Sequence, residues 1–450
     1  MKIFLISSNY ATSPFPVYPL GLSIIAKSLE DAGYSVKQFD FLQNDKSIIK
    51  FRAELDEFKP DIVGISIRNI DNINLLNKQS YIETVCDIVN NVHNSSTAKV
   101  VLGGSGFSLM PDVILKHVKA DYGIVGEGET LFLEFINNAA NNIYPDKKCI
   151  VSSNILTGKD ILPASYDTSI MKYYLKSGSI APIQTKRGCP HHCIYCSYPL
   201  LEGHHLRCRP AQQVVDDIVK LKNEFGAKFI FFTDSVFNDD EGHYLDVINE
   251  MHKRRVAIPC TAFFKPGNIK AESICLMKET GLSAVEIGAD GSTDYSLKKL
   301  GKIFSFKDVI RTNLLFNSFD IPTANYYIFG VPGETNDIVL QGVDNILSLE
   351  KTVSFIYMGI RILPDTGLHK LAVNQNYISD SNLLEPVYYI SPSLDKNWLE
   401  STLTDKFKEN RNCIFPPDSM KNQSIILHSM GQTGILWDLL LKKRRKRRVR

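Results

Sequence analysis

The sequence predicts an α/β protein built on two successive parallel sheets. Short β-branched apolar runs alternate with helix-period segments along most of the 450 residues. This alternation is interrupted once, by a stretch without sustained period between about residues 141 and 178. Glycine clusters follow several of the predicted strands, where the turns of strand–helix units lie. The pattern favours an N-terminal doubly wound, Rossmann-like sheet followed by a partial (β/α)6 barrel.

The composition describes an ordinary globular chain of two or three domains, with 44% apolar and 22% charged residues. No apolar run has transmembrane length, and the opening apolar stretch, Ile3–Ile6, is too short for a signal peptide. Nine cysteines, an odd number, indicate a reducing interior rather than a disulfide scaffold. We therefore expect a cytoplasmic protein.

The first predicted domain covers residues 1–140. Its strands are expected at Lys2–Ser8, Ser35–Phe41, Asp61–Arg68, Lys99–Gly106 and Tyr122–Glu127, with helices such as Gly21–Asp31 and Tyr81–Val92 between them. A doubly wound sheet binds its ligand at the carboxyl ends of its strands. Glycines stand at two of these ends, in 103–106 and 126–129, although βα turns often need glycine anyway. No G-x-G-x-x-G follows the first strand, which argues against a dinucleotide.

Residues 141–178, with Pro145, Gly158 and Pro163, are predicted to be a connector. The barrel domain, 179–370, has strands expected at Ile180–Arg187, Lys228–Asp234, Cys260–Lys265, Ala284–Ala289, Thr323–Val331 and Ser354–Leu363. Its helices are expected at Pro210–Phe225, Tyr244–Arg255, Ala271–Thr280 and Asp337–Leu349. Six repeats are too few for a closed eight-stranded barrel, and a partial barrel would keep its chemistry at the strand carboxyl ends. Residues 371–450 are expected to form an irregular cap and a basic tail.

The most specific motif is a cysteine loop in the segment 185–196. Cys189, Cys193 and Cys196 have a Cys-x3-Cys-x2-Cys spacing. Three thiolates on one tight loop can hold three irons of a [4Fe–4S] cluster and leave the fourth iron open. Zinc is the alternative, with His191 or His192 as a further ligand, but structural zinc usually has two separated ligand pairs. The other six cysteines are scattered singly and are expected to be small buried residues.

This loop resembles the signature of the radical S-adenosylmethionine (SAM) superfamily. The resemblance implies that the open iron binds the amino and carboxylate groups of SAM. The reduced cluster would then release a 5′-deoxyadenosyl radical that takes a hydrogen from the substrate, with electrons from a flavodoxin- or ferredoxin-type partner. It also implies SAM-binding roles for residues of the loop and of later strand ends: Tyr195, Asp234, Glu286, Gly330, Pro332 and Arg361. For Asp234, a solvated helix cap is an equally good interpretation.

Four segments of the N-terminal domain, 18–22, 65–68, 102–104 and 125–129, resemble the cobalamin-binding domain of one large branch of this superfamily. The resemblance implies a corrin site formed by Leu20, Gly21, Ser66, Gly103, Gly104, Gly126, Glu127 and Gly128. The cobalt-ligating Asp-x-His-x-x-Gly is absent, and Asp40–Asn44 stand in its place. The corrin would bind without a protein imidazole below the cobalt, or the domain has lost cobalamin.

The resemblance favours methyl transfer to an unactivated carbon, with ring formation or another rearrangement as alternatives. The opening segment 16–22 resembles a group associated with lipid biosynthesis. An RNA-modifying methylthiotransferase is disfavoured, because a second cluster needs three N-terminal cysteines and only Cys86 and Cys149 are present. A corrinoid- or metal-sensing binding protein is the non-enzymatic alternative.

The chain ends in an apolar stretch, Ile435–Leu441, followed by eight basic residues within 442–450. Without these eight, the formal charge of +2 becomes −6. An apolar patch beside a polybasic cluster suits an anionic membrane surface, which would place the protein at the inner membrane face. Nonspecific RNA binding and a solubilising tail are the alternatives, and no specific nucleic-acid partner is expected.

Overall fold

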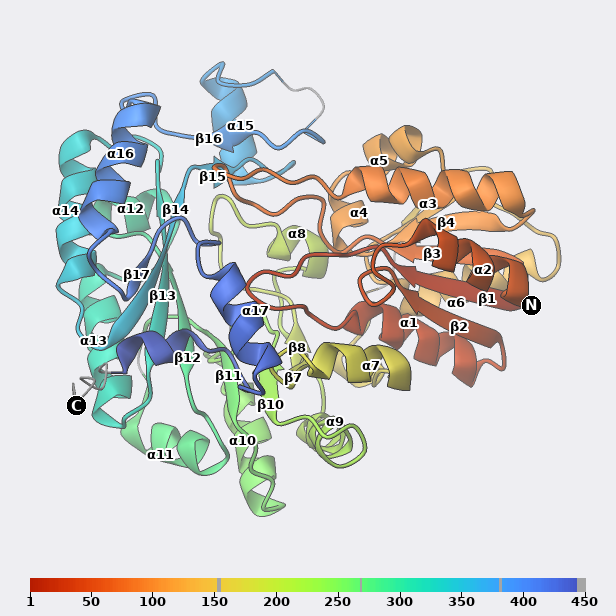
Figure 1. The fold of residues 1–450 in the computed structure, drawn as a ribbon, viewed down its shortest axis with the longest axis horizontal. Coiled ribbons are helices and arrows are strands. Elements are labelled where there is room, and N and C mark those ends of the chain that lie inside the picture. The colour runs from red at the N-terminus through yellow and green to blue at the C-terminus, as the bar shows by residue number, and fades with distance from the viewer. Residues whose placement is uncertain (152–154, 268, 380–382, 443–450) are drawn as a thin grey trace, which may run out of the picture. The chain divides into compact units, whose positions relative to one another are not determined.

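The computed structural model describes residues 1–450 except 152–154, 268, 380–382 and 443–450. Its contacts divide the chain into two compact units (Figure 1). Unit 1 contains residues 1–176, 184–226 and 361–388, and unit 2 contains 177–183, 227–360 and 389–450. The segments 184–226 and 361–370, which the sequence assigned to the barrel, thus group by contacts with the N-terminal sheet, as does 371–388, which it assigned to the C-terminal cap.

Unit 1 contains a parallel six-stranded sheet of order β2-β1-β3-β4-β5-β6. Its strands are β1 (Lys2–Ser7), β2 (Ser35–Asp40), β3 (Ile62–Ser66), β4 (Lys99–Gly103), β5 (Tyr122–Val125) and β6 (Cys149–Val151). The five predicted strands are confirmed. β6 was missed because it is short and lies in the predicted connector.

The alternation of side chains along β1 separates two helical layers. Ile3 and Leu5 belong to a core that includes residues of α1 (Leu20–Asp31) and α6 (Gly128–Ala139). Between them in sequence, Phe4 stacks on Phe51 of α2 (Ile48–Phe58) with 6.1 Å between ring centroids. The helix α3 (Ile82–Ser95) contacts both α2 and α5 (Pro111–Val118). Both faces of the sheet are therefore covered, as a doubly wound fold requires.

The remaining elements of unit 1 lie outside the six-stranded sheet. They are α4 (Ser105–Leu109), η1 (Gly158–Asp160), α7 (Thr168–Leu175), β8 (Lys186–Arg187), α8 (Tyr198–Glu202), β9 (Arg207–Cys208), α9 (Ala211–Asn223) and α15 (Gly367–Asn374). β8 pairs antiparallel with β9. The predicted strand Ile180–Arg187 is therefore wrong as one element. It breaks because Arg209 donates its backbone N–H to the carbonyl of Thr185 and its guanidinium to that of Gln184.

Unit 2 contains a parallel seven-stranded sheet whose neighbours follow the order of the chain. Its strands are β7 (Ile180–Ile183), β10 (Phe229–Phe232), β11 (Cys260–Phe264), β12 (Val285–Asp290), β13 (Thr323–Phe329), β14 (Thr352–Met358) and β17 (Cys413–Ile414). This arrangement confirms the partial barrel. The predicted strand Ser354–Leu363 ends early, because Gly359 has a φ of 75° and separates β14 from β15 (Ile360–Arg361).

The helices of unit 2 are α10 (His243–Lys253), α11 (Ala271–Glu279), α12 (Asp294–Lys299), α13 (Phe306–Ser318), α14 (Asn336–Leu347), α16 (Lys396–Phe407), α17 (Lys421–Ser429) and η2 (Trp437–Leu441). α16, β17, α17 and η2 correct the prediction of an irregular C-terminal cap. β17 extends the barrel sheet beside β14, and β16 (Tyr388–Tyr389) pairs with β15. No helix among the described residues is long and apolar enough to cross a bilayer.

Candidate cofactor sites

The cysteine loop is held from its flanks within unit 1. Gly188, with a φ of 96°, could not be another residue, because a Cβ there would lie 2.1 Å from the carbonyl oxygen of His205. Its N–H donates to Glu202 at 3.0 Å, and the N–H of Cys189 donates to the carbonyl of Gly203 at 3.0 Å. On the far side of the loop, Leu368 donates its N–H to Ile194. These contacts fix the loop backbone on both sides of the three cysteines.

The three thiols fit a cluster better than a single zinc ion. Cys189 is buried, Cys193 and Cys196 are half-buried, and none of the three forms a disulfide. Three thiolates on one loop are the donor set of an iron–sulfur cluster, whereas structural zinc is almost always held by four protein ligands.

A buried ion cluster fastens the base of this loop to the sheet of unit 1. Arg187 immediately precedes Gly188, and its guanidinium nitrogens lie 3.1 Å from Glu127 and 2.5 Å from Glu129. Arg207 lies 2.6 Å from the same Glu127. Burial lowers the pKa of Arg187, but the charges of Glu129 and Glu127 outweigh burial and raise it. These four residues, called the ion cluster below, connect the strand before the cysteines to the turn after β5.

Some of the predicted cobalamin residues are explained by packing. A Cβ on Gly104 would lie 2.6 Å from the carbonyl oxygen of Ile67, and one on Gly128 would lie 2.9 Å from Ile25. Glu127 belongs to the ion cluster, so its carboxylate is already paired. The packing and ion-pair contacts of these three residues therefore account for their presence at the carboxyl edge of the sheet.

Other predicted cobalamin residues line that edge openly. Gly126 has a φ of 85° with no atom near an added Cβ, and its N–H donates to Ser108 at 2.9 Å. Gly21, at the start of α1 next to Leu20, also has open space around it. Ser66 and Gly103 end β3 and β4, where a Cβ on Gly103 would meet only one atom within 4 Å, at 3.9 Å. A ligand backbone or ring can therefore approach closely here.

The sheet order places the switch point between β1 and β3, where doubly wound folds of this order bind their ligand. Two residues there were missed by sequence reasoning. Asn9, after β1, is 5% exposed, and its Oδ1 has no hydrogen-bond partner among the described residues. Arg68, after β3, is exposed and takes part in no ion pair formed within the described chain, so its guanidinium is accessible to an anionic group of a ligand. A polar ligand such as cobalamin fits this edge. Asn9 and Arg68 could have been found in the sequence from their position directly after the two central strands.

In unit 2, the predicted SAM residues Asp234, Gly330 and Pro332 lie at the carboxyl ends of strands. Asp234 is 2% exposed just after β10. Gly330 follows β13 with a φ of 97°. Glu334, which sequence reasoning passed over, holds this turn: its buried carboxyl accepts the N–H groups of Gly330 and Val331 and the hydroxyl of Ser296. Burial raises the pKa of Glu334, against these hydrogen bonds.

Glu286 lies elsewhere than predicted. It is the second residue of β12 and not at the strand end, so it stands about 13 Å before Asp290 at the usual rise of a strand. Its two oxygens accept from the hydroxyl of Tyr326 at 2.5 Å and from the indole N–H of Trp437 at 3.2 Å. Burial raises the pKa of Glu286 to about 6. The structure thus gives this carboxyl protein partners, and a role toward SAM stays a prediction.

The guanidinium of Arg361 likewise has protein partners within unit 1. Its Nε lies 2.8 Å from Asp71, and its other nitrogens donate to the carbonyls of Ile362 and Leu383. Both side chains of the ion pair are 1% exposed. The predicted clamp on SAM is untested, and the observed partners account for this guanidinium without a ligand. Tyr195 is half-buried inside the cysteine loop.

Two family models match the chain. A B12 binding domain model matches residues 6–136, and a radical SAM superfamily model matches residues 183–344. The tryptophan 2-C-methyltransferase of Streptomyces laurentii is 24% identical over 441 residues, covering 80% of this chain and 73% of that protein. The hopanoid C-3 methylase of Methylococcus capsulatus is 26% identical over 272 residues, covering 55% and 48%.

Among solved structures, a radical SAM methyltransferase from Kitasatospora setae with cobalamin and a [4Fe–4S] cluster bound has a TM-score of 0.84. It is 22% identical, and the match covers 98% of this chain and 97% of that one. This likeness establishes the fold.

The chain belongs to the radical SAM superfamily and is a radical SAM enzyme. It carries a B12-binding domain ahead of the radical SAM domain, which places it in the cobalamin-dependent branch. Its cofactors are a [4Fe–4S] cluster, SAM and cobalamin.

Proposed function

We propose that this protein is a C-methyltransferase that methylates an unactivated carbon of a small organic substrate. The ion cluster is the observation that carries the proposal. Because Arg187 pairs with Glu127 and Glu129, the predicted cluster loop and the predicted cobalamin edge belong to one compact unit. Such a frame would keep a source of radicals and a carrier of methyl groups in a fixed relation, as transfer between them needs.

Each residue has a role in this proposal. Cys189, Cys193 and Cys196 would ligate the iron cluster, with Tyr195 beside them. When bound, the cofactors supply a substrate radical and a methyl group, while the protein positions the reactants and excludes water. Asn9, Arg68, Ser66 and the glycines of the carboxyl edge would hold the corrin. Asp234 would accept the amino group of SAM, and the turn at Gly330 and Pro332 would lie beside its adenine.

The substrate class is proposed from the relatives, which act on different molecules. A hopanoid is a lipid, and the opening segment resembles a lipid-associated group, so a lipid substrate is the more specific version of the proposal. Tryptophan, the substrate named for the Streptomyces relative, represents a different class, that of aromatic amino acids. We further propose a cytoplasmic protein reduced by a flavodoxin- or ferredoxin-type partner.

The test is anaerobic reconstitution followed by turnover with methyl-deuterated SAM. The wild type should bind about four irons per chain and one cobalamin, and a substrate should gain three deuterium atoms. Cys193→Ala should lose the cluster and all turnover, whereas Cys275→Ala, which changes an exposed cysteine of unit 2, should keep both. A product without the label would show a rearrangement instead, and a bound zinc in place of iron would overturn the enzyme assignment.

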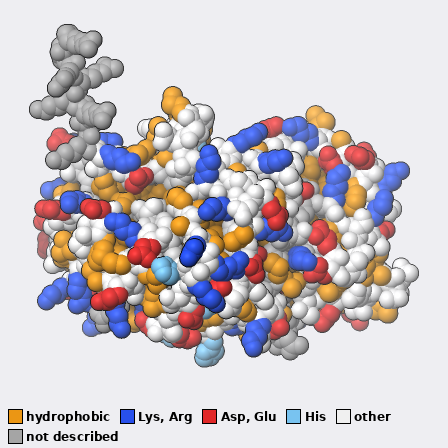
Figure 2. All heavy atoms as spheres, turned by 90° about the horizontal axis from the view of Figure 1, so that it is seen from below, with side chains coloured by type: hydrophobic (Ala, Val, Ile, Leu, Met, Phe, Trp, Pro, Cys, Tyr) orange, Lys and Arg blue, Asp and Glu red, His pale blue; other side chains and the backbone are white. Residues whose placement is uncertain are grey.

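Membrane contact is a separate part of the proposal, and the structure corrects its basis. Ile435, Leu436 and Trp437 are buried, so the prediction that they face lipid is wrong. The basic residues after Lys442 lie outside the described residues. Exposed apolar side chains instead gather on and just after α17, at Ile425, Ile426 and Met430. On the face drawn in Figure 2, basic and acidic side chains are interspersed. In this proposal the basic residues of the tail supply the attraction to anionic lipid.

Sedimentation with anionic vesicles tests this contact. Truncation after Leu441 should abolish binding, because each basic residue near the lipid contributes about 1 kcal/mol. Ile426→Ser should weaken it with the tail intact. Equal partition of all three proteins would remove the membrane proposal and leave the methyltransferase proposal untouched.

A further inference from the structure

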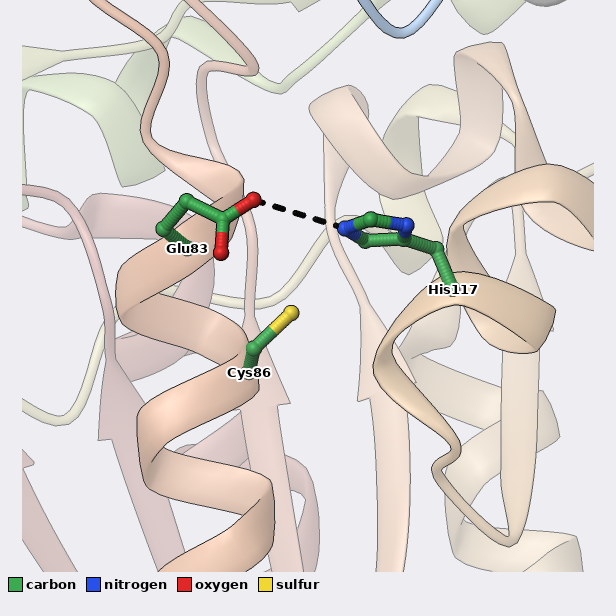
Figure 3. Close-up of side chains that lie close together, drawn as sticks. All are labelled: Glu83, Cys86 and His117. Atoms are coloured by element: carbon green, nitrogen blue, oxygen red, sulfur yellow. Dashed lines mark ion pairs between the residues drawn. The ribbon is translucent and has the colours of Figure 1, made fainter.

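Three side chains with metal-binding atoms converge on the surface of unit 1, and none of them is assigned to a cofactor above (Figure 3). Glu83 and Cys86 lie three residues apart on α3, so they share one face of that helix. His117 comes from the last turn of α5, a helix in contact with α3. One ligand atom from each residue lies within 4.8 Å of the other two.

The ion pair alone does not account for this arrangement. Nε2 of His117 lies 3.5 Å from Glu83, and the two side chains are 42% and 79% exposed, so their mutual attraction is weak. Cys86 is half-buried and forms no disulfide. Burial, together with Glu83 and Asp87, raises the pKa of its thiol. A bound cation would reverse that balance and release the proton of the thiol.

We propose that Glu83, Cys86 and His117 bind one Zn²⁺ ion, with water as the fourth ligand. One sulfur, one imidazole nitrogen and one carboxylate oxygen are the three donor types that zinc takes in proteins. A site with three protein ligands and water is also normal for zinc. The ion would crosslink the first turns of α3 and the last turn of α5. This inference does not depend on the proposed methyl transfer.

The test uses zinc X-ray absorption on the full-length protein with its iron cluster loaded to about four irons per chain, so that the cysteine loop is already filled. After incubation with zinc and gel filtration, the wild type should keep about one zinc with a single sulfur in a nitrogen and oxygen shell. Cys86→Ser should lose the sulfur, and His117→Gln should weaken binding about tenfold or more, since even indirect partners of a metal contribute that much. Cys275→Ser, which changes an exposed cysteine of unit 2, should behave as wild type.

Three results would overturn the site. One is the absence of retained zinc in the wild type. Another is a sulfur signal that survives in Cys86→Ser. The third is a shell of three sulfurs, which would place the zinc in the cysteine loop. Unchanged thermal unfolding of the variants in metal-free buffer serves as the folding control.

Discussion

Unit 1 and unit 2 stabilise buried carboxyl groups in different ways. In unit 1, Glu129 and Asp71 lie against the guanidinium groups of Arg187 and Arg361. In unit 2, Glu286 and Glu334 are held by hydroxyl, indole and backbone N–H donors without charge. A buried charge needs a charged partner or shifts its pKa toward the neutral form. In unit 2, burial accordingly raises the pKa of both Glu286 and Glu334.

The way in which a buried carboxyl group is stabilised depends on its hydrogen-bond or ion-pair partner rather than on its unit, as Asp40 illustrates. This residue ends β2 in unit 1, and its carboxyl accepts from Tyr174 and from the N–H of Gln43. Burial raises the pKa of Asp40 to about 6, as it does for Glu286. In unit 2, Asp290 at the end of β12 has the opposite arrangement, an ion pair with Lys302. Charged and uncharged partners of buried carboxyl groups thus occur in both units, and the partner rather than the unit decides how each carboxyl is stabilised.

The largest effect is expected when the ion cluster is broken. Arg187→Met leaves Glu129 buried without its cation and should lower the free energy of unfolding by about 3–5 kcal/mol. The cysteine loop should lose its fixed base, so iron incorporation should fall as well. Urea unfolding and iron content measure both effects. Arg52→Met, which changes an exposed arginine of unit 1, is the control, and equal behaviour of the two variants would contradict the role of the ion cluster.

A smaller effect is expected at the other buried ion pair. Arg361→Lys keeps a charge near Asp71 but cannot reach the carbonyls of Ile362 and Leu383 at the same time. Each buried acceptor left unpaired costs about 1–3 kcal/mol. Urea unfolding should show a loss of this size, while the affinity for SAM should stay unchanged. A change in SAM affinity at unaltered stability would instead restore Arg361 as a SAM ligand.

The smallest effect is a pH dependence in unit 2. The pKa of Glu286 rises from 4.5 unfolded to about 6 folded, so its stabilising contribution is complete below pH 4.5 and is lost as pH rises through 6. The loss amounts to about 2 kcal/mol. Glu286→Gln should remove this pH dependence and gain stability relative to the wild type above pH 7. Urea unfolding between pH 5 and 8 measures it, with exposed Glu272→Gln as control. An unchanged pH profile in Glu286→Gln would contradict the assignment of the titration.

Much of the fold could be predicted because its signals are local. The strands of both sheets follow from apolar periodicity, and the cysteine loop from the spacing of Cys189, Cys193 and Cys196. The short strands were harder, because β6 and β17 contain too few residues for a period to appear. Gly359 and Arg209 end strands through a positive φ and a side-chain donor, respectively, which a run of apolar residues does not reveal.

The sequence by itself determined the class of this protein: two parallel α/β sheets, three cysteines with one iron left open, and a cobalamin-type domain. The tertiary structure alone decided which side chains meet. Arg187 and Glu129 are 58 residues apart, Glu286 and Trp437 are 151 apart, and Asp71 and Arg361 are 290 apart. Periodicity and spacing act over neighbouring residues, whereas the partner of a buried charge is chosen by packing, and packing has no local signature in the chain.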